Sequence, residues 1–104
     1  MTRVERRPDM IKIVSKNLIR EDKVEEFKSL MKELVEKSSA EEGCIHYSLN
    51  VSRENPRMFA FIEFWRDQDA IDKHNATEHF QRLVPMMRGM REDSALDIFT
   101  ELEF

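Results

Sequence analysis

The chain has 104 residues, of which 40% are hydrophobic and 37% charged, and its formal net charge is −4. This composition is typical of one folded globular domain. The acidic balance argues against a nucleic-acid partner, which would need a clustered cationic surface. No segment approaches the ~20 apolar residues of a membrane span, so no membrane partner is expected. The single cysteine, Cys44, excludes an internal disulfide and favours a reducing, cytoplasmic location.

Residues 1–9 differ from the rest of the chain because they are polar, basic and without periodicity. We expect a flexible N-terminal extension over 1–9 and a single domain over 10–104. Residues 10–19 are rich in β-branched side chains and predict the first strand.

A helix is expected next. Asp22 and Glu25 have the spacing of a capping box, and Gly43 is a natural residue for the C-terminal stop. Between them, apolar side chains recur at helical spacing on one stripe: Val24, Phe27, Leu30, Met31, Leu34 and Val35.

Two strands are predicted over residues 44–52 and 57–66, joined by a turn at 53–56. The second of these strands is apolar on both faces, with Phe59, Phe61 and Trp65 on one side and Met58, Ile62 and Phe64 on the other. In a sheet covered by helices on one face only, the other face meets water. Something must therefore cover the second face, and the simplest cover is a second copy of the chain in a homodimer.

A helical region from about residue 67 to 90 carries a break. Ile71 and His74 lie in one angular sector, whereas Phe80 and Leu83 lie in a sector rotated by about a third of a turn. A break near 75–77, with Thr77 capping a second short helix, reconciles them. Pro85 predicts a further interruption.

A last strand is expected over 94–104. The order of elements is then β-α-β-β-α-β, which predicts an α+β fold, the ferredoxin-like sandwich.

Matching apolar faces across the predicted hairpin sets Tyr47 opposite Ile62, His46 opposite Glu63 and Cys44 opposite Trp65. Cross-strand partners lie about 5 Å apart at Cβ, so His46 and Glu63 could hydrogen-bond. The carboxylate would then raise the histidine pKa and fix its tautomer, as for a general base. A structural ion pair is the alternative.

Metal and nucleotide sites are not expected. His74 and His79 would lie roughly 140° apart on an unbroken helix and could not share a metal. Phosphate-binding loops need several glycines, and the chain has only Gly43 and Gly89.

These features resemble the antibiotic biosynthesis monooxygenase (ABM) domain family, in particular its small quinol monooxygenases. The likeness covers residues 10–103 and is carried by Glu42-Gly43-Cys44, Tyr47, Leu49, Pro56, Phe59, Glu63, Trp65, Asp67, Ala70, His74, Thr77, His79 and Phe80. The resemblance implies a dimeric α+β barrel, with a pocket in each subunit between sheet and helices. It also implies oxygenation of small aromatics with O₂ and without a cofactor.

The expected function is therefore a cofactor-independent monooxygenase acting on a small quinol or other electron-rich aromatic. The candidate catalytic residues are His74, as base or substrate-orienting group, with Glu63, Tyr47 and His46. The candidate substrate-binding residues are Trp65, Phe59, Phe61, Phe80, His79 and Asn17. Two alternatives stay open: an isomerase or degrading enzyme acting on a small carbonyl signalling compound, with or without a phosphate group, and a non-catalytic module that binds small aromatics.

Overall fold

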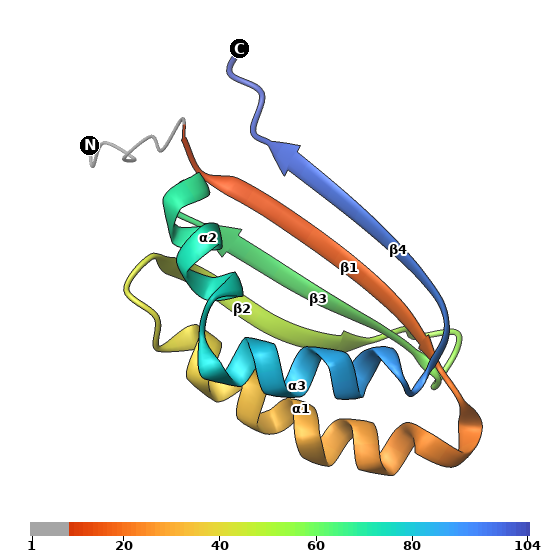
Figure 1. Ribbon diagram of the computed structural model, residues 1–104. Helices are drawn as coiled ribbons and strands as arrows, with labels where there is room; N and C mark the ends of the chain where they lie inside the picture. Colours follow the sequence, from red (N-terminus) through yellow and green to blue (C-terminus); the bar gives the residue numbers. More distant parts are fainter. Residues whose placement is uncertain (1–8) are drawn as a thin grey trace.

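A computed structural model describes residues 9–104 of the chain (Figure 1). The elements follow the predicted order, with the second helical region divided in two. They are β1 (Ile11–Ile19), a 3₁₀ turn (Glu21–Lys23), α1 (Val24–Ser39), β2 (Cys44–Val51), β3 (Met58–Trp65), α2 (Gln68–Asn75), α3 (Glu78–Arg88) and β4 (Arg91–Thr100). The extension predicted over residues 1–9 lies, apart from its last residue, outside the described residues.

The four strands form one sheet in the order β2-β3-β1-β4, and every neighbouring pair is antiparallel. The helices lie on the same side of this sheet (Figure 1). The predicted α+β, ferredoxin-like fold is confirmed. Among residues 9–104 there is no helix long and apolar enough to span a membrane. The cytoplasmic location stays a prediction.

The core lies between the helices and the sheet face that they cover. The apolar stripe of α1 buries Phe27, Met31 and Leu34, as its spacing predicts. The ring of Phe27 packs on Phe59 of β3 with centroids 4.8 Å apart. Full burial of such side chains stabilises the fold by roughly 1.5–3 kcal/mol each, so this layer fixes how α1 sits on the sheet.

The predicted hairpin register is wrong by one residue over most of its length. Cys44 pairs with Trp65 as expected, but a bulge between Cys44 and His46 then shifts the strand, so that His46 pairs with Phe64 and Tyr47 with Glu63. A bulge places two residues of one strand opposite one of the other and reverses which side chains share a face. Tyr47 therefore shares the helix-covered face with Glu63, and His46 lies exposed on the opposite face.

The break in the second helical region is confirmed. Helix α2 ends at Asn75, and α3 begins after Thr77, whose hydroxyl accepts a hydrogen bond from the backbone N–H of Phe80. Asp67 caps α2 in the same way, through the N–H of Ala70. The interruption predicted at Pro85 is wrong, because α3 continues through Pro85 to Arg88.

Three local signals at element ends misled the sequence prediction. The N-terminus of α1 has no side-chain cap, so the Asp22–Glu25 capping box is wrong. Gly43 does not stop α1, which ends four residues earlier; a Cβ at this position would lie 2.3 Å from the Cβ of Ala70, so Gly43 instead permits α2 to approach the sheet closely. The last strand begins at Arg91 and ends at Thr100, earlier than predicted.

Candidate active site

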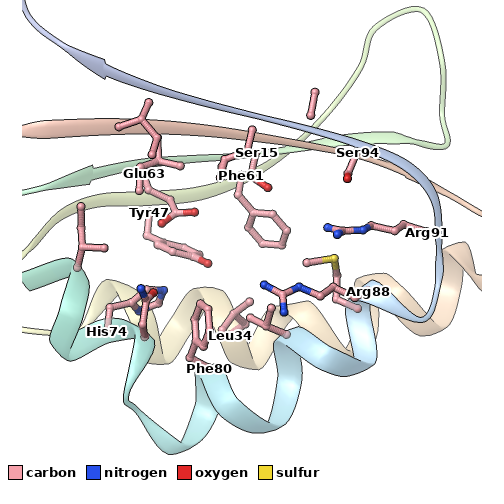
Figure 2. A pocket seen from close by; sticks show the side chains of 18 residues that line it. Ser15, Leu34, Tyr47, Phe61, Glu63, His74, Phe80, Arg88, Arg91 and Ser94 are labelled. Carbon is pink, nitrogen blue, oxygen red and sulfur yellow. The ribbon is translucent and has the colours of Figure 1, made fainter.

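A pocket of about 350 Å³ lies between the helix-covered face of the sheet and helices α2 and α3 (Figure 2). Its volume lies in the range of small-molecule sites. Ser15, Tyr47, Phe61 and Glu63 line it from the sheet, and His74, Phe80 and Arg88 line it from the helices. Strand β4 completes the wall with Arg91, Ser94 and Leu96. Leu96 is 63% exposed, which shows that the pocket is open along β4.

His74 is the best-defined polar group of the pocket. It lies on the inward stripe of α2, is 3% exposed, and lines the pocket wall. Its Nδ1 donates a hydrogen bond of 2.7 Å to Oε2 of Glu41, in the segment between α1 and β2. Since Nδ1 carries the donated proton, Nε2 keeps a free lone pair.

The helix break brings His79 to the same carboxylate. His79 Nε2 donates to Glu41 Oε2 at 2.9 Å, so a single oxygen accepts from both imidazoles. Both rings are largely shielded from water, at 4% and 13% side-chain exposure, and the carboxylate is 15% exposed. In such surroundings charge-assisted hydrogen bonds are strong, and together they hold the ring of His74 in one orientation.

Aromatic rings surround His74 on its remaining sides. The indole of Trp65 lies 4.4 Å from the imidazole, Phe80 lies 5.1 Å away and Tyr47 5.7 Å away, all measured between ring centroids. This burial lowers the pKa of His74, against the opposing effect of the Glu41 carboxylate. His74 is therefore a neutral imidazole at pH 7.

Glu63 and Tyr47 form the adjoining polar wall. Oε1 of Glu63 accepts a hydrogen bond of 2.9 Å from Nε1 of Trp65. Burial raises the pKa of the Glu63 carboxyl to about 7, although the Trp65 hydrogen bond favours the ionised form. Burial also raises the pKa of Tyr47, so its phenol stays protonated. In Figure 2 both side chains point into the pocket above His74.

Glu41, His74 and His79 are also the residues, within 9–104, that could hold a metal ion, since their ligand atoms lie within 4.8 Å of one another. Two imidazoles and a carboxylate are a donor set that zinc and iron accept. His74 and His79 meet here because α2 and α3 are separate helices, so the separation of roughly 140° expected on an unbroken helix does not apply. The observed spacings of 2.7 and 2.9 Å are those of hydrogen bonds. The absence of a metal stays a prediction.

The structure brings together most of the candidate residues named from the sequence. Tyr47, Phe61, Glu63, His74 and Phe80 line the pocket. Trp65 and His79 contact His74 from behind the wall, while Phe59 and Asn17 are buried. His46 is a correction: its predicted hydrogen bond to Glu63 is wrong, since the bulge directs it to the other sheet face, where Nε2 lies 2.8 Å from the hydroxyl of Ser48.

Three residues of the site were missed. Glu41 lies 33 residues before His74 and 38 before His79 in the chain, and no local pattern links them. Arg88 is the last residue of α3, and Arg91 is the first residue of β4. Both residues bring cationic groups to the pocket. The sequence did contain one signal for these cationic groups, because Arg88 and Arg91 flank Gly89-Met90 at the predicted helix end.

A two-layer α+β domain with a small-molecule pocket between its layers is the class of protein that these observations define. The family model described as "Antibiotic biosynthesis monooxygenase" matches residues 10–86. The chain belongs to this antibiotic biosynthesis monooxygenase (ABM) family, as its sequence predicts.

Individual relatives agree with this assignment. "Putative monooxygenase YcnE" of Bacillus subtilis is 43% identical over 68 residues, which are 64% of this chain and 70% of that protein. "Uncharacterized protein sll1783" of Synechocystis is 36% identical over 76 residues, which are 73% of this chain and only 52% of that protein. A crystal structure described as an antibiotic biosynthesis monooxygenase superposes with a TM-score of 0.85 at 35% identity, covering 89% of this chain and 99% of that one. The family model, YcnE and this crystal structure support a monooxygenase-type role.

The raised pKa of Glu63 predicts a specific pH dependence of stability. The unfolded chain loses the Glu63 proton near pH 4.5, but the folded protein loses it only near pH 7. Its contribution is thus fully present below pH 4.5 and is lost as the pH rises through 7. Relative to Glu63→Gln, which can still accept from Trp65, the wild type should lose roughly 2–4 kcal/mol between pH 4.5 and 8. Urea unfolding at several pH values measures this, with the exposed Glu25→Gln as control. Parallel curves for wild type and Glu63→Gln would contradict it.

Proposed function

We propose that this chain is a cofactor-independent monooxygenase that oxidises a small quinol or similar electron-rich aromatic with O₂. One observation carries the proposal: a neutral, buried imidazole lines the pocket, and its Nδ1 is held by Glu41, which leaves Nε2 as a base. Family membership supports the monooxygenase-type chemistry. The quinol class and the independence from a cofactor come from the resemblance in sequence.

The proton step belongs to His74. Nε2 takes the proton of a phenolic hydroxyl, and the imidazolium that forms is stabilised by the carboxylate of Glu41 on the opposite nitrogen. A carboxylate that orients a histidine base and stabilises its charged form is the arrangement found in catalytic triads. General-base help of this kind is typically worth ~10²–10⁴-fold in rate.

The oxygen step needs little from the protein beyond a dry site. An electron-rich quinolate can pass an electron to O₂ by itself; a C–O bond then forms, and the hydroperoxide loses water to leave a hydroxyquinone, so the substrate supplies all the electrons. The pocket has only to hold the ring and limit the access of water. Phe61, Phe80 and Tyr47 supply the aromatic surface against which the ring packs. Glu63, with a pKa of about 7, can return a proton to an oxygen of the product.

One observation favours a second candidate function. Arg88 and Arg91 line the same pocket, and cationic groups are what a phosphorylated substrate would need. An isomerase or degrading enzyme acting on a small phosphorylated carbonyl compound would use the same base, but would consume no oxygen. The two candidates therefore differ in the response to removal of O₂.

Oxygen uptake tests the leading candidate. With a panel of small quinols, the wild type should consume O₂ above the autoxidation rate and give a hydroxyquinone that has gained one oxygen atom and lost two hydrogen atoms, the second oxygen atom of O₂ leaving as water. His74→Ala should lower this rate tenfold or more, because the base is lost. His46→Ala is the matched control, since His46 lies exposed on the other sheet face, and it should keep the wild-type rate. Turnover that is equally fast without oxygen would favour the second candidate, and uptake unaffected by His74→Ala would exclude the proposed base.

We also propose that the protein is a homodimer, with the helix-free sheet faces of two copies packed together. The helices leave this sheet face open (Figure 1), and it carries Met58, Ile62 and Phe64, which alternate along β3 with the buried residues of the other face. Apolar surface that helices leave open is a common basis for association.

Sedimentation tests the dimer. At micromolar concentration the chain should sediment at twice its mass of 12.5 kDa. Ile62→Lys should shift it toward the monomer, because the charge would be buried between the two sheets. Ser29→Lys, which adds the same charge at an exposed position of α1 away from this face, is the control for net charge. A monomeric wild type would contradict the proposal.

A further inference from the structure

The end of the pocket away from His74 is cationic. Arg88, at the C-terminus of α3, and Arg91, at the start of β4, both line it. In Figure 2 the guanidinium group of Arg91 lies far from His74, that of Arg88 lies between Phe80 and Arg91, and Ser15 and Ser94 face the pocket from the sheet. The acidic side chain that lines the pocket, Glu63, belongs to the His74 end.

These two arginines differ from most others in the described part of the chain. Arg20, Arg57, Arg66 and Arg82 each lie within 4.0 Å of a carboxylate. Arg88 and Arg91 have no such ion pair within residues 9–104, although Asp and Glu are abundant in the chain. Two cations that face a pocket without protein counter-charges are suited to an anionic ligand.

Arg91 is also held in place. Its Nη1 donates a hydrogen bond of 3.0 Å to Oδ1 of Asn17, which is fully buried. The amide of Asn17 in turn donates to the backbone carbonyl of Ser15 at 3.2 Å and to its hydroxyl at 3.3 Å. Asn17 therefore acts as a positioning residue behind the wall, which explains a buried polar side chain on the core face of β1. A guanidinium fixed in this way loses less entropy when it binds an anion.

The strand register gives the separation of the two ends. Glu63 pairs with Ile13, and Arg91 is bonded to Asn17, four residues further along β1. At about 3.3 Å per residue this corresponds to roughly 13 Å along the strand. A single small ring at His74 could not also reach the guanidinium group of Arg91.

We propose that the substrate is elongated and carries a terminal anionic group, a carboxylate or a phosphate, which Arg88 and Arg91 bind while the reacting ring lies at His74. This inference rests on the proposed function only in taking the pocket as the substrate site. It narrows the substrate class to molecules in which the quinol, or another reactive group, carries an extension that ends in an acid. The arginines set specificity and take no part in the chemical step.

Calorimetry under nitrogen tests the proposal without turnover. The ligands are 6-(2,5-dihydroxyphenyl)hexanoic acid, its methyl ester, its phosphate-terminated analogue, and the short homologue (2,5-dihydroxyphenyl)acetic acid. In the wild type the long acid should bind at least tenfold more tightly than the ester, since two charge-assisted contacts are lost in the ester. The short acid should show little of this advantage. Comparison of the carboxylate and the phosphate identifies the preferred anion.

Variants test which residues make the acid bind more tightly than the ester. Arg88→Gln and Arg91→Gln should each reduce the advantage of acid over ester, and the double variant should abolish it while ester binding persists. Arg88 is exposed, so Arg88→Gln should fold normally. It remains informative even if loss of the hydrogen bond to Asn17 lowers the stability of Arg91→Gln. Arg53→Gln, the same charge change on a turn outside the pocket, should leave the advantage intact. Equal affinity for acid and ester in the wild type, or an advantage that survives the double variant, would overturn the inference. Acid-selective binding without oxygen uptake would instead overturn the proposed oxygenation alone.

Discussion

The hydrogen bonds from His74 and His79 to a single oxygen of Glu41 join the segment after α1, helix α2 and helix α3 at one point. A buried carboxylate without partners would be strongly unfavourable, so these contacts are also a condition for closing this side of the core. They require the break between α2 and α3, because a continuous helix would direct the two imidazoles apart. The same contacts decide which nitrogen of His74 is protonated, and thereby connect the fold to the proposed chemistry.

The two ends of the pocket differ in their chemistry. At one end, aromatic burial keeps His74 neutral and raises the pKa of Glu63, so that a base and an acid lie close together near pH 7. At the other end, Arg88 and Arg91 are without protein carboxylates as partners in the described residues, and Asn17 holds one of them from behind. An apolar wall with Phe61 and Leu34 separates the two ends, which fits a substrate with a reactive ring and a remote charge.

Much of the architecture could be predicted from the sequence. Helical spacing in α1, the alternation along β3 and the cap at Thr77 are local signals, and each gave the correct element or break. The register of the hairpin could not be predicted, because the bulge near Ile45 leaves no signature in composition, yet it moved His46 out of the site and Tyr47 into it. Glu41 was missed since its role arises from contacts across more than thirty residues. Arg88 and Arg91 look like ordinary surface charge in the sequence, because only the packing of α3 on the sheet and the pairing of β4 with β1 bring them to one pocket.

The protonation of His74 is the most direct test of how Glu41 controls the site. Long-range ¹H–¹⁵N correlation spectra of the histidine side chains at pH 7, assigned by comparison with His74→Ala, report which ring nitrogen carries the proton. We expect a neutral His74 with the proton on Nδ1 and an unprotonated Nε2, and loss of this single tautomer in Glu41→Ala, which removes the acceptor. A proton on Nε2 alone, or a doubly protonated ring at pH 7, would contradict the role of His74 as a base held by Glu41.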